Sequence, residues 1–332
     1  AAQTEWKWVV ENAGNTIYKD WAKARLAAKA PEKKDTSARL WRLSARYGYE
    51  YDDNVTLKPG DEALASSEGS DAGRQLAEFI VRRRVHSSRD TAIDLKGGFR
   101  QTFHDSGLDD FNFTSLEAGA DVQHRVTWFG RKVTLRLEYD LKAGFLDGNT
   151  FSTRNIGTLS ADTRFTENTR TVLFYRLTGA EFGPDGSRPA QSSRVGIYQD
   201  VGLTQYWYLN DPKNYIFLRG ELNGASTTGS NFDSLGTTAR LGYHAGIFKN
   251  TDLDLMTGYE FNNYLHFDSL SSLDRGERQD SIWDIYGALT HYFTPEIGLR
   301  VFYRHVNADN DNGFFEYTRN IGGAQLLYSK AF

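Results

Sequence analysis

From about residue 40 to the carboxyl terminus, apolar and polar residues alternate one by one, and this period of two predicts a chain folded almost entirely into β-strands. The clearest segment is 132–146, whose apolar face consists of Val133, Leu135, Leu137, Tyr139, Leu141, Ala143 and Phe145. The opposite face carries Thr134, Arg136, Glu138, Asp140, Lys142 and Gly144. Because a slip by one residue would exchange the two faces, the pattern specifies the strand register firmly.

The same pattern, followed along the chain, predicts fourteen strands at 40–56, 75–86, 91–104, 110–128, 132–146, 152–165, 169–181, 192–208, 215–226, 234–248, 252–266, 278–293, 297–307 and 314–332. Short turns are expected to alternate with longer polar loops near 57–74, 105–109, 147–151, 182–191, 227–233, 267–277 and 308–313. An even number of strands brings both chain ends to one side of the sheet.

Alternation alone fits either a soluble sandwich or a membrane barrel, since both separate an apolar from a polar face. Three features favour an antiparallel transmembrane β-barrel of about fourteen strands: the alternating connection lengths, strands of roughly ten to fourteen residues, and aromatic residues towards the strand ends. These aromatic residues are Trp41, Tyr49, Tyr51, Trp128, Phe145, Trp207, Tyr264 and Phe293. The predicted location is therefore the bacterial outer membrane, with both termini periplasmic.

Composition agrees with that class. With 39% hydrophobic residues and a mean hydropathy of -0.57, the chain is too polar for a helical membrane protein. It contains no cysteine, as suits an oxidising compartment that has dispensed with thiols. The 39 basic and 43 acidic residues nearly balance, so nucleic acid is not an expected partner. The polar start at residues 1–4 predicts a mature or trimmed chain.

If the apolar face meets lipid, the charged residues of the opposite face must line the lumen. The predicted lining residues are Arg42, Arg46, Glu50, Arg82, Arg84, Asp94, Arg100, Glu117, Asp121, Arg136, Glu138, Asp140, Arg176, Asp200, Arg219, Glu221, Arg240, Asp254, Glu260, Asp284, Arg300 and Arg304. Such a wall has two interpretations: the charges satisfy one another in a polar interior, or they line an aqueous path. Six aromatic residues at inward positions offer surfaces for stacking sugar rings or simply fill space: Tyr198, Tyr206, Phe217, Tyr286, Tyr292 and Phe302.

The first 39 residues differ in kind and form a separate amino-terminal segment, with the barrel occupying 40–332. Residues 16–30 show the pattern of a short amphipathic helix, which ends before the polar run at 31–35. This helix is expected to be a plug in the barrel mouth or the end of a periplasmic helical domain. A loosely ordered leader is the alternative.

The candidate catalytic and metal sites in the sequence lack the residues or the spacing that such sites require. Asn307, Asp309, Asp311 and Gly313 resemble a calcium loop, but the glycine is one position late and the terminal glutamate is missing. The seven histidines are scattered, and no two have the spacing of metal ligands. We therefore predict a protein that is not an enzyme and uses no metal and no cofactor.

Two short motifs carry a family resemblance. Tyr328 and Phe332, with Leu326 and Ala324 on the same face, resemble the terminal signal read by the outer-membrane assembly machinery, although Lys330 departs from the usual apolar residue. Residues 49–55, Tyr-Glu-Tyr-Asp-Asp-Asn-Val, are similar to the first strand of barrels from exopolysaccharide operons. They also resemble the barrels that follow tetratricopeptide repeats in polysaccharide exporters and in surface lipoprotein assembly modifiers.

The resemblance implies transport: an outer-membrane pore that passes a saccharide polymer or oligomer through a charged lumen. The alternatives are the barrel of a protein secretion or surface-assembly factor, and a structural or adhesive barrel that acts through its outer loops. The expected partners are outer-membrane lipid and lipopolysaccharide, the assembly machinery, a saccharide substrate, and a periplasmic helical-repeat domain or export partner.

Overall fold

The computed structural model describes residues 41–57, 71–105, 107–183, 190–209, 211, 213–267, 277–311 and 316–332. The strands are β1 (Trp41–Asp52), β2 (Ala72–Ser87), β3 (Thr91–His104), β4 (Phe113–Trp128), β5 (Arg131–Leu146), β6 (Asn149–Thr166), β7 (Thr169–Phe182), β8 (Gly196–Tyr208), β9 (Tyr215–Thr227), β10 (Ser234–Phe248), β11 (Thr251–Phe267), β12 (Glu277–Tyr292), β13 (Ile297–Asn310) and β14 (Tyr317–Ala331). Among the described residues there are also three short 3-10 turns, η1 (Asp109–Phe111), η3 (Ala190–Ser192) and η4 (Ser230–Phe232).

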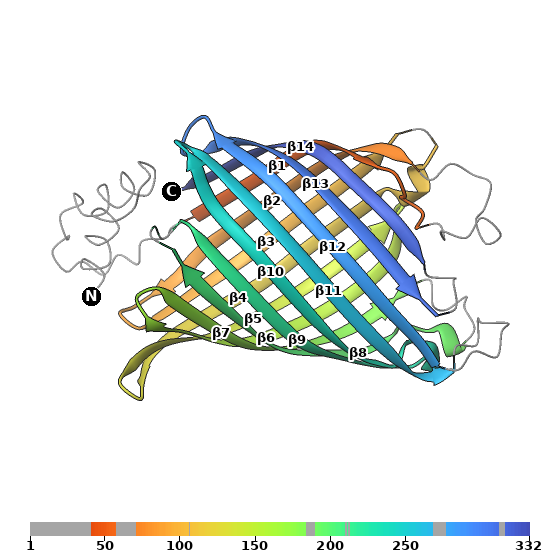
Figure 1. The fold of residues 1–332 in the computed structure, drawn as a ribbon, viewed down its shortest axis with the longest axis horizontal. Helices are drawn as coiled ribbons and strands as arrows, with labels where there is room; N and C mark the ends of the chain where they lie inside the picture. Colours follow the sequence, from red (N-terminus) through yellow and green to blue (C-terminus); the bar gives the residue numbers. More distant parts are fainter. Residues whose placement is uncertain are drawn as a thin grey trace.

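All fourteen strands form one closed antiparallel barrel, in which consecutive strands pair and β1 pairs with β14 (Figure 1). This confirms the fold class predicted from the alternation. The segment 1–39 and its predicted helix lie outside the described residues, as does most of the predicted loop 57–74. No helix among the residues with described structure is long and apolar enough to cross a membrane.

The two ends of the barrel differ in their connections. One end, here called the turn end, carries tight connections such as 129–130, 167–168 and 249–250, together with the start of β1 and the end of β14 (Figure 1, left). The opposite end, the loop end, carries most of the longer connections. One prediction is wrong here, because the expected loop at 147–151 is only the two-residue turn Asp147–Gly148. Both residues adopt positive φ angles, 46° and 74°, which such a tight reversal requires.

Several predicted strand boundaries also need correction. The first strand ends at Asp52 rather than 56, and the second begins at Ala72 rather than 75. The eighth begins at Gly196 rather than 192, because η3 occupies residues 190–192. The correction at β2 matters for function, because it moves Arg74 from a loop into the barrel wall.

The outer surface of the barrel is apolar. Leu137 and Leu222, both at outward positions, are 55% and 61% exposed. In a soluble protein such side chains would be buried, whereas in a transmembrane barrel they contact lipid. The interior is correspondingly polar: among the described residues, 18 polar or charged side chains are buried against 10 apolar ones.

Aromatic side chains border the apolar belt at both ends of the barrel. Trp41, Trp128 and Phe293 are exposed at the turn end. Tyr49 and Tyr51 are exposed at the loop end, where their hydroxyls donate to Asp105 and Asp71 over 2.8 Å each. A ring in contact with apolar surface and a hydroxyl bonded to a carboxylate suit the membrane interface.

Candidate functional site: the charged lumen

The strand register places the charged residues predicted to line the lumen on the inward face. Arg46 of β1 lies opposite Glu78 of β2, and Glu78 lies opposite Arg100 of β3, so these three side chains form one inward row. The same parity continues around the barrel to Arg304 of β13, which lies opposite Tyr286 of β12. Since successive residues of a strand point to opposite faces, every second residue of each strand faces the lumen.

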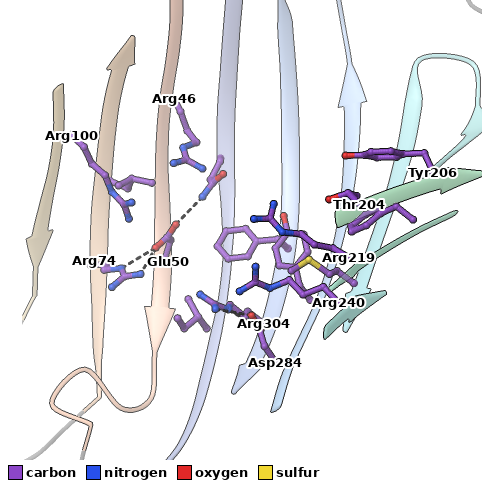
Figure 2. Close-up of a pocket in the computed structure, with 17 residues that line it drawn as sticks. Arg46, Glu50, Arg74, Arg100, Thr204, Tyr206, Arg219, Arg240, Asp284 and Arg304 are labelled. Carbon is purple, nitrogen blue, oxygen red and sulfur yellow. Dashed lines mark hydrogen bonds and ion pairs between the residues drawn. The ribbon is translucent and has the colours of Figure 1, made fainter. Parts of the chain in front are cut away.

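A cavity of about 610 Å³ lies in the lumen between β1–β3 and β8–β14. Figure 2 shows charged and polar side chains of both walls pointing into it. Its lining residues are Arg46, Glu50, Arg74, Leu76, Arg100, Thr204, Tyr206, Phe217, Arg219, Arg240, Met256, Asp284, Tyr286, Phe302, Arg304, Ile321 and Gln325. The sequence-based set therefore divides, because seven of its members line this cavity and the others lie elsewhere on the inner wall.

Six arginines line the cavity but only two carboxylates do, Glu50 and Asp284. Three of the arginines, Arg46, Arg74 and Arg100, come from β1–β3, and three come from β9, β10 and β13 on the other side (Figure 2). The predicted lining set contains eleven arginines and eleven carboxylates, so the lining of this cavity departs from that balance. Its lining is predominantly cationic.

Most of these arginines pair with a carboxylate, which lies either in the wall behind the cavity or in its lining. Arg46 pairs with Glu78 at 2.7 Å, and Arg74 pairs with Glu50 at 2.8 Å. Across the lumen, Glu221 accepts from Arg219 at 2.6 Å and from Arg240 at 3.1 Å. These contacts hold the guanidinium groups in place against the wall.

Arg100 is different, because no carboxylate of the described chain lies within ion-pair distance of its guanidinium. Its Nε is buried and has no hydrogen-bond partner. Gln101, next in sequence, faces outward and bonds to Thr114. Glu78, the cross-strand neighbour of Arg100, is paired with Arg46, so Arg100 has no carboxylate of its own among the described residues.

Aromatic rings share the cavity with the arginines. Tyr206 contacts Phe217 at a centroid distance of 5.7 Å, and Tyr286 stacks on Phe302 at 6.2 Å. The Phe217 ring lies flat against the wall over Gly242, its cross-strand partner. A Cβ at position 242 would lie 2.1 Å from the Phe217 ring. Because Gly242 has no side chain, the ring can lie against the wall and not in the centre of the lumen.

The wall formed by β3–β5 has a different character, because its charges neutralise one another. Lys96, only 8% exposed, lies 2.9 Å from Glu117, 2.8 Å from Glu138 and 2.6 Å from Asp140. Arg136 pairs with Asp121 and also with Glu138. Here the interpretation of mutually satisfied charges describes the structure well.

Several residues central to these arrangements were absent from the sequence-based set. Lys96 lies at an inward position of β3. The alternation in the sequence predicts this position, but it does not identify the three carboxylates that Lys96 contacts. Arg74 had been assigned to a loop. Asp52 and Arg319 lie at the loop end, where Arg319 Nε donates to Asp52 Oδ1 at 2.9 Å.

Tyr264 had been expected at the lipid interface and instead faces the lumen. Its ring lies 3.5 Å from the guanidinium of Arg278, which is itself only 4% exposed. Nearby, the Asn231 side chain of η4 donates to Ser192 of η3 at 3.3 Å. This contact joins two loop-end connections on the same side of the barrel.

No group of three or more histidine, cysteine, aspartate or glutamate side chains within the described ranges has the geometry to hold a metal ion. Individual histidines bond to single neighbours, as His244 does to Asp254 at 2.6 Å. Gly313 of the calcium-like run lies outside the described residues.

No protein family model and no curated protein matches the chain. Among solved structures, it is similar to OccAB4 of Acinetobacter baumannii, with 8% identity over 90% of this chain and 99% of the other and a TM-score of 0.43. It is similar to OprD of Pseudomonas aeruginosa with 8% identity over 89% of this chain and 95% of the other and a TM-score of 0.40. It is also similar to OccK9 (OpdG) of the same organism, with 8% identity over 89% of this chain and 99% of the other and a TM-score of 0.44. At these values the description of the barrel rests on this chain's own strand pairing.

Proposed function

We propose that the protein is a pore of the bacterial outer membrane. The observation that carries this proposal is the inverted barrel, apolar on the outside and charged within, around a cavity of about 610 Å³. Closure satisfies every strand edge, which lipid requires, and a hydrated charged lumen gives polar solutes a way across.

We assign the turn end to the periplasm and the loop end to the cell exterior, because bacterial barrels keep short turns on the periplasmic side. Lipopolysaccharide then surrounds the loop end. The outward face of the last strand, with Leu326, Tyr328 and Phe332, serves as the recognition signal for the assembly machinery. Since β1 begins at the turn end, we propose that residues 1–39 link the barrel to a helical-repeat or export partner in the periplasm.

The solute we propose is a saccharide polymer or oligomer. The support is the cavity lining, in which Tyr206, Phe217, Tyr286 and Phe302 present ring faces beside hydrogen-bonding arginines. Sugars have both apolar ring faces and many hydroxyls, so this mixture of side chains suits them better than an all-aliphatic wall.

Planar-bilayer recordings of the purified full chain test the pore directly. Steady channels of constant amplitude are expected. Closed or flickering behaviour would instead favour a docking barrel of a secretion or surface-assembly factor. A chain that stays compact and dissolved without detergent would contradict both.

The sequence-based hypothesis of a plug has its own test. If residues 1–39 obstruct the lumen, their removal raises the single-channel conductance. Unchanged conductance would reject the plug and leave the linker hypothesis.

A further inference from the structure

We propose that the cavity is an anion-binding site, formed by Arg46, Arg74 and Arg100 on one wall and by Arg219, Arg240 and Arg304 on the other. Together with its aromatic rings, it is suited to an acidic oligosaccharide, one whose sugar units carry carboxylates. This inference rests on the proposed pore function and names the class of solute that the pore selects.

The balance of charge carries the first step. Arg319 shares Asp52 with Arg74, so seven arginines belong to the cavity and the wall behind it. The carboxylates paired with them are five, Glu50, Asp52, Glu78, Glu221 and Asp284, and Glu260 is a sixth that borders the adjoining pocket beside Arg240, Arg304 and Arg319. A positive excess therefore remains in a space partly screened from water, where an anion is attracted more strongly than in bulk solution.

The position of the carboxylates carries the second step. Glu78 and Glu221 lie in the wall and do not line the cavity, whereas the guanidinium groups of their partners do. Asp52 is fully buried. A solute in the cavity therefore meets mainly N–H donors, and planar guanidinium groups bind carboxylates through paired hydrogen bonds.

Arg100 carries the third step, because it has no carboxylate partner and a buried Nε without an acceptor. The Nε itself lies out of reach of a solute, so an incoming carboxylate would bind the terminal N–H groups of the Arg100 guanidinium, which lines the cavity. The cationic cluster thus includes one arginine whose charge is not committed to the protein.

The aromatic residues indicate which class of anion the cavity binds. Phe217 lies flat on the wall over Gly242, and Tyr286 stacks on Phe302, so ring faces and edges border the space between the arginines. A small inorganic anion would use the arginines alone. A sugar acid uses both the arginines and the rings.

The adjacent wall formed by β3–β5 does not compete for the solute. Lys96 and Arg136 of β3 and β5 are each held by two or more carboxylates. Their positive charge is neutralised locally, so the path of an anion is defined on the β1–β3 and β9–β13 side.

The experiment compares tri-galacturonate with maltotriose, a neutral saccharide of the same number of units. Calorimetric titration of the detergent-solubilised full chain measures binding, and planar-bilayer recording measures block of the current and, under a potassium chloride gradient, the sign of the reversal potential. We expect binding and block by tri-galacturonate at concentrations at least about tenfold lower than by maltotriose, together with anion selectivity that weakens in 1 M salt.

Arg100→Gln is the informative variant, because it leaves no carboxylate orphaned. It should weaken tri-galacturonate binding about tenfold, the value of one charge-assisted hydrogen bond. Arg82→Gln is the matched control, an inward arginine of the β1–β3 wall that forms no ion pair with a described residue and does not line the cavity. It should change binding less than about twofold.

The outcomes separate the two proposals. Equal binding of the two saccharides, or cation selectivity, overturns the anion site and leaves the pore standing. Tight tri-galacturonate binding in a barrel that never conducts overturns the pore and keeps the site. Equal effects of Arg100→Gln and Arg82→Gln would show that general charge, and not this cavity, is responsible.

Discussion

Asp52, near the end of the first strand, and Arg319, near the start of the last, form a bidentate ion pair across the seam that closes the barrel. Arg319 Nε lies 2.9 Å from Asp52 Oδ1 and 3.1 Å from Oδ2. The neighbouring Asp53 accepts from the backbone N–H and the side chain of Asn320, each at 2.6 Å. The Asp-Asp-Asn run, which begins at the last residue of β1, thus joins the first and last strands of the sheet.

Asp52→Asn should destabilise the barrel by about 3 kcal/mol, because it removes the buried counter-charge of both Arg74 and Arg319. Guanidinium unfolding in lipid vesicles measures this loss. Asp53→Asn provides the comparison, since Asp53 bonds a neutral amide and the backbone, and should cost about 1 kcal/mol. Equal losses of stability in the two variants would show that the Asp52 ion pairs stabilise the barrel no more than the Asp53 hydrogen bonds do.

Lys96→Met should also destabilise the barrel, by about 3–5 kcal/mol, because it leaves three neighbouring carboxylates without their common partner. Thermal unfolding, followed as the loss of the compact species on a denaturing gel, reports the change. Restoring charge balance in Lys96→Met/Asp140→Asn should recover part of the lost stability. No recovery would mean that packing around the lysine stem matters more than charge.

Gly242→Leu should lower the single-channel conductance, because its side chain would displace the Phe217 ring from the wall into the cavity. Single-channel recording measures this directly. Gly242→Leu/Phe217→Ala is the control, since removing the ring makes room for the leucine and should bring the conductance back. A normal conductance in the single variant would place the narrowest point elsewhere.

Leu137→Arg tests the lipid-facing assignment. Leu137 is 55% exposed in the middle of β5, and an arginine there should cost about 2–4 kcal/mol of folding free energy. Phe129→Arg, at the turn end and 90% exposed, should cost about 0–1 kcal/mol, because the penalty falls towards the interface. Equal costs measured in vesicles would argue against a membrane belt at this depth.

The strands and their two faces were predictable because their signal is local. A period of two assigns Leu137 to the outside and Glu138 to the inside without knowledge of any other strand. The loop connections were less predictable, since Asp147–Gly148 makes a two-residue turn where a longer loop was expected. Arg74 was missed for the same reason, because a boundary set three residues late placed it outside the sheet.

The sequence by itself determined an inverted all-β cylinder and the inward direction of its charges, because alternation and an even number of strands require only short-range order. The tertiary structure alone decided which charges meet. Lys96 pairs with carboxylates from two other strands, Arg100 pairs with none of the described carboxylates, and six arginines from separate strands line one cavity. Those neighbours depend on strand tilt and closure, which bring together residues as far apart in the chain as Asp52 and Arg319.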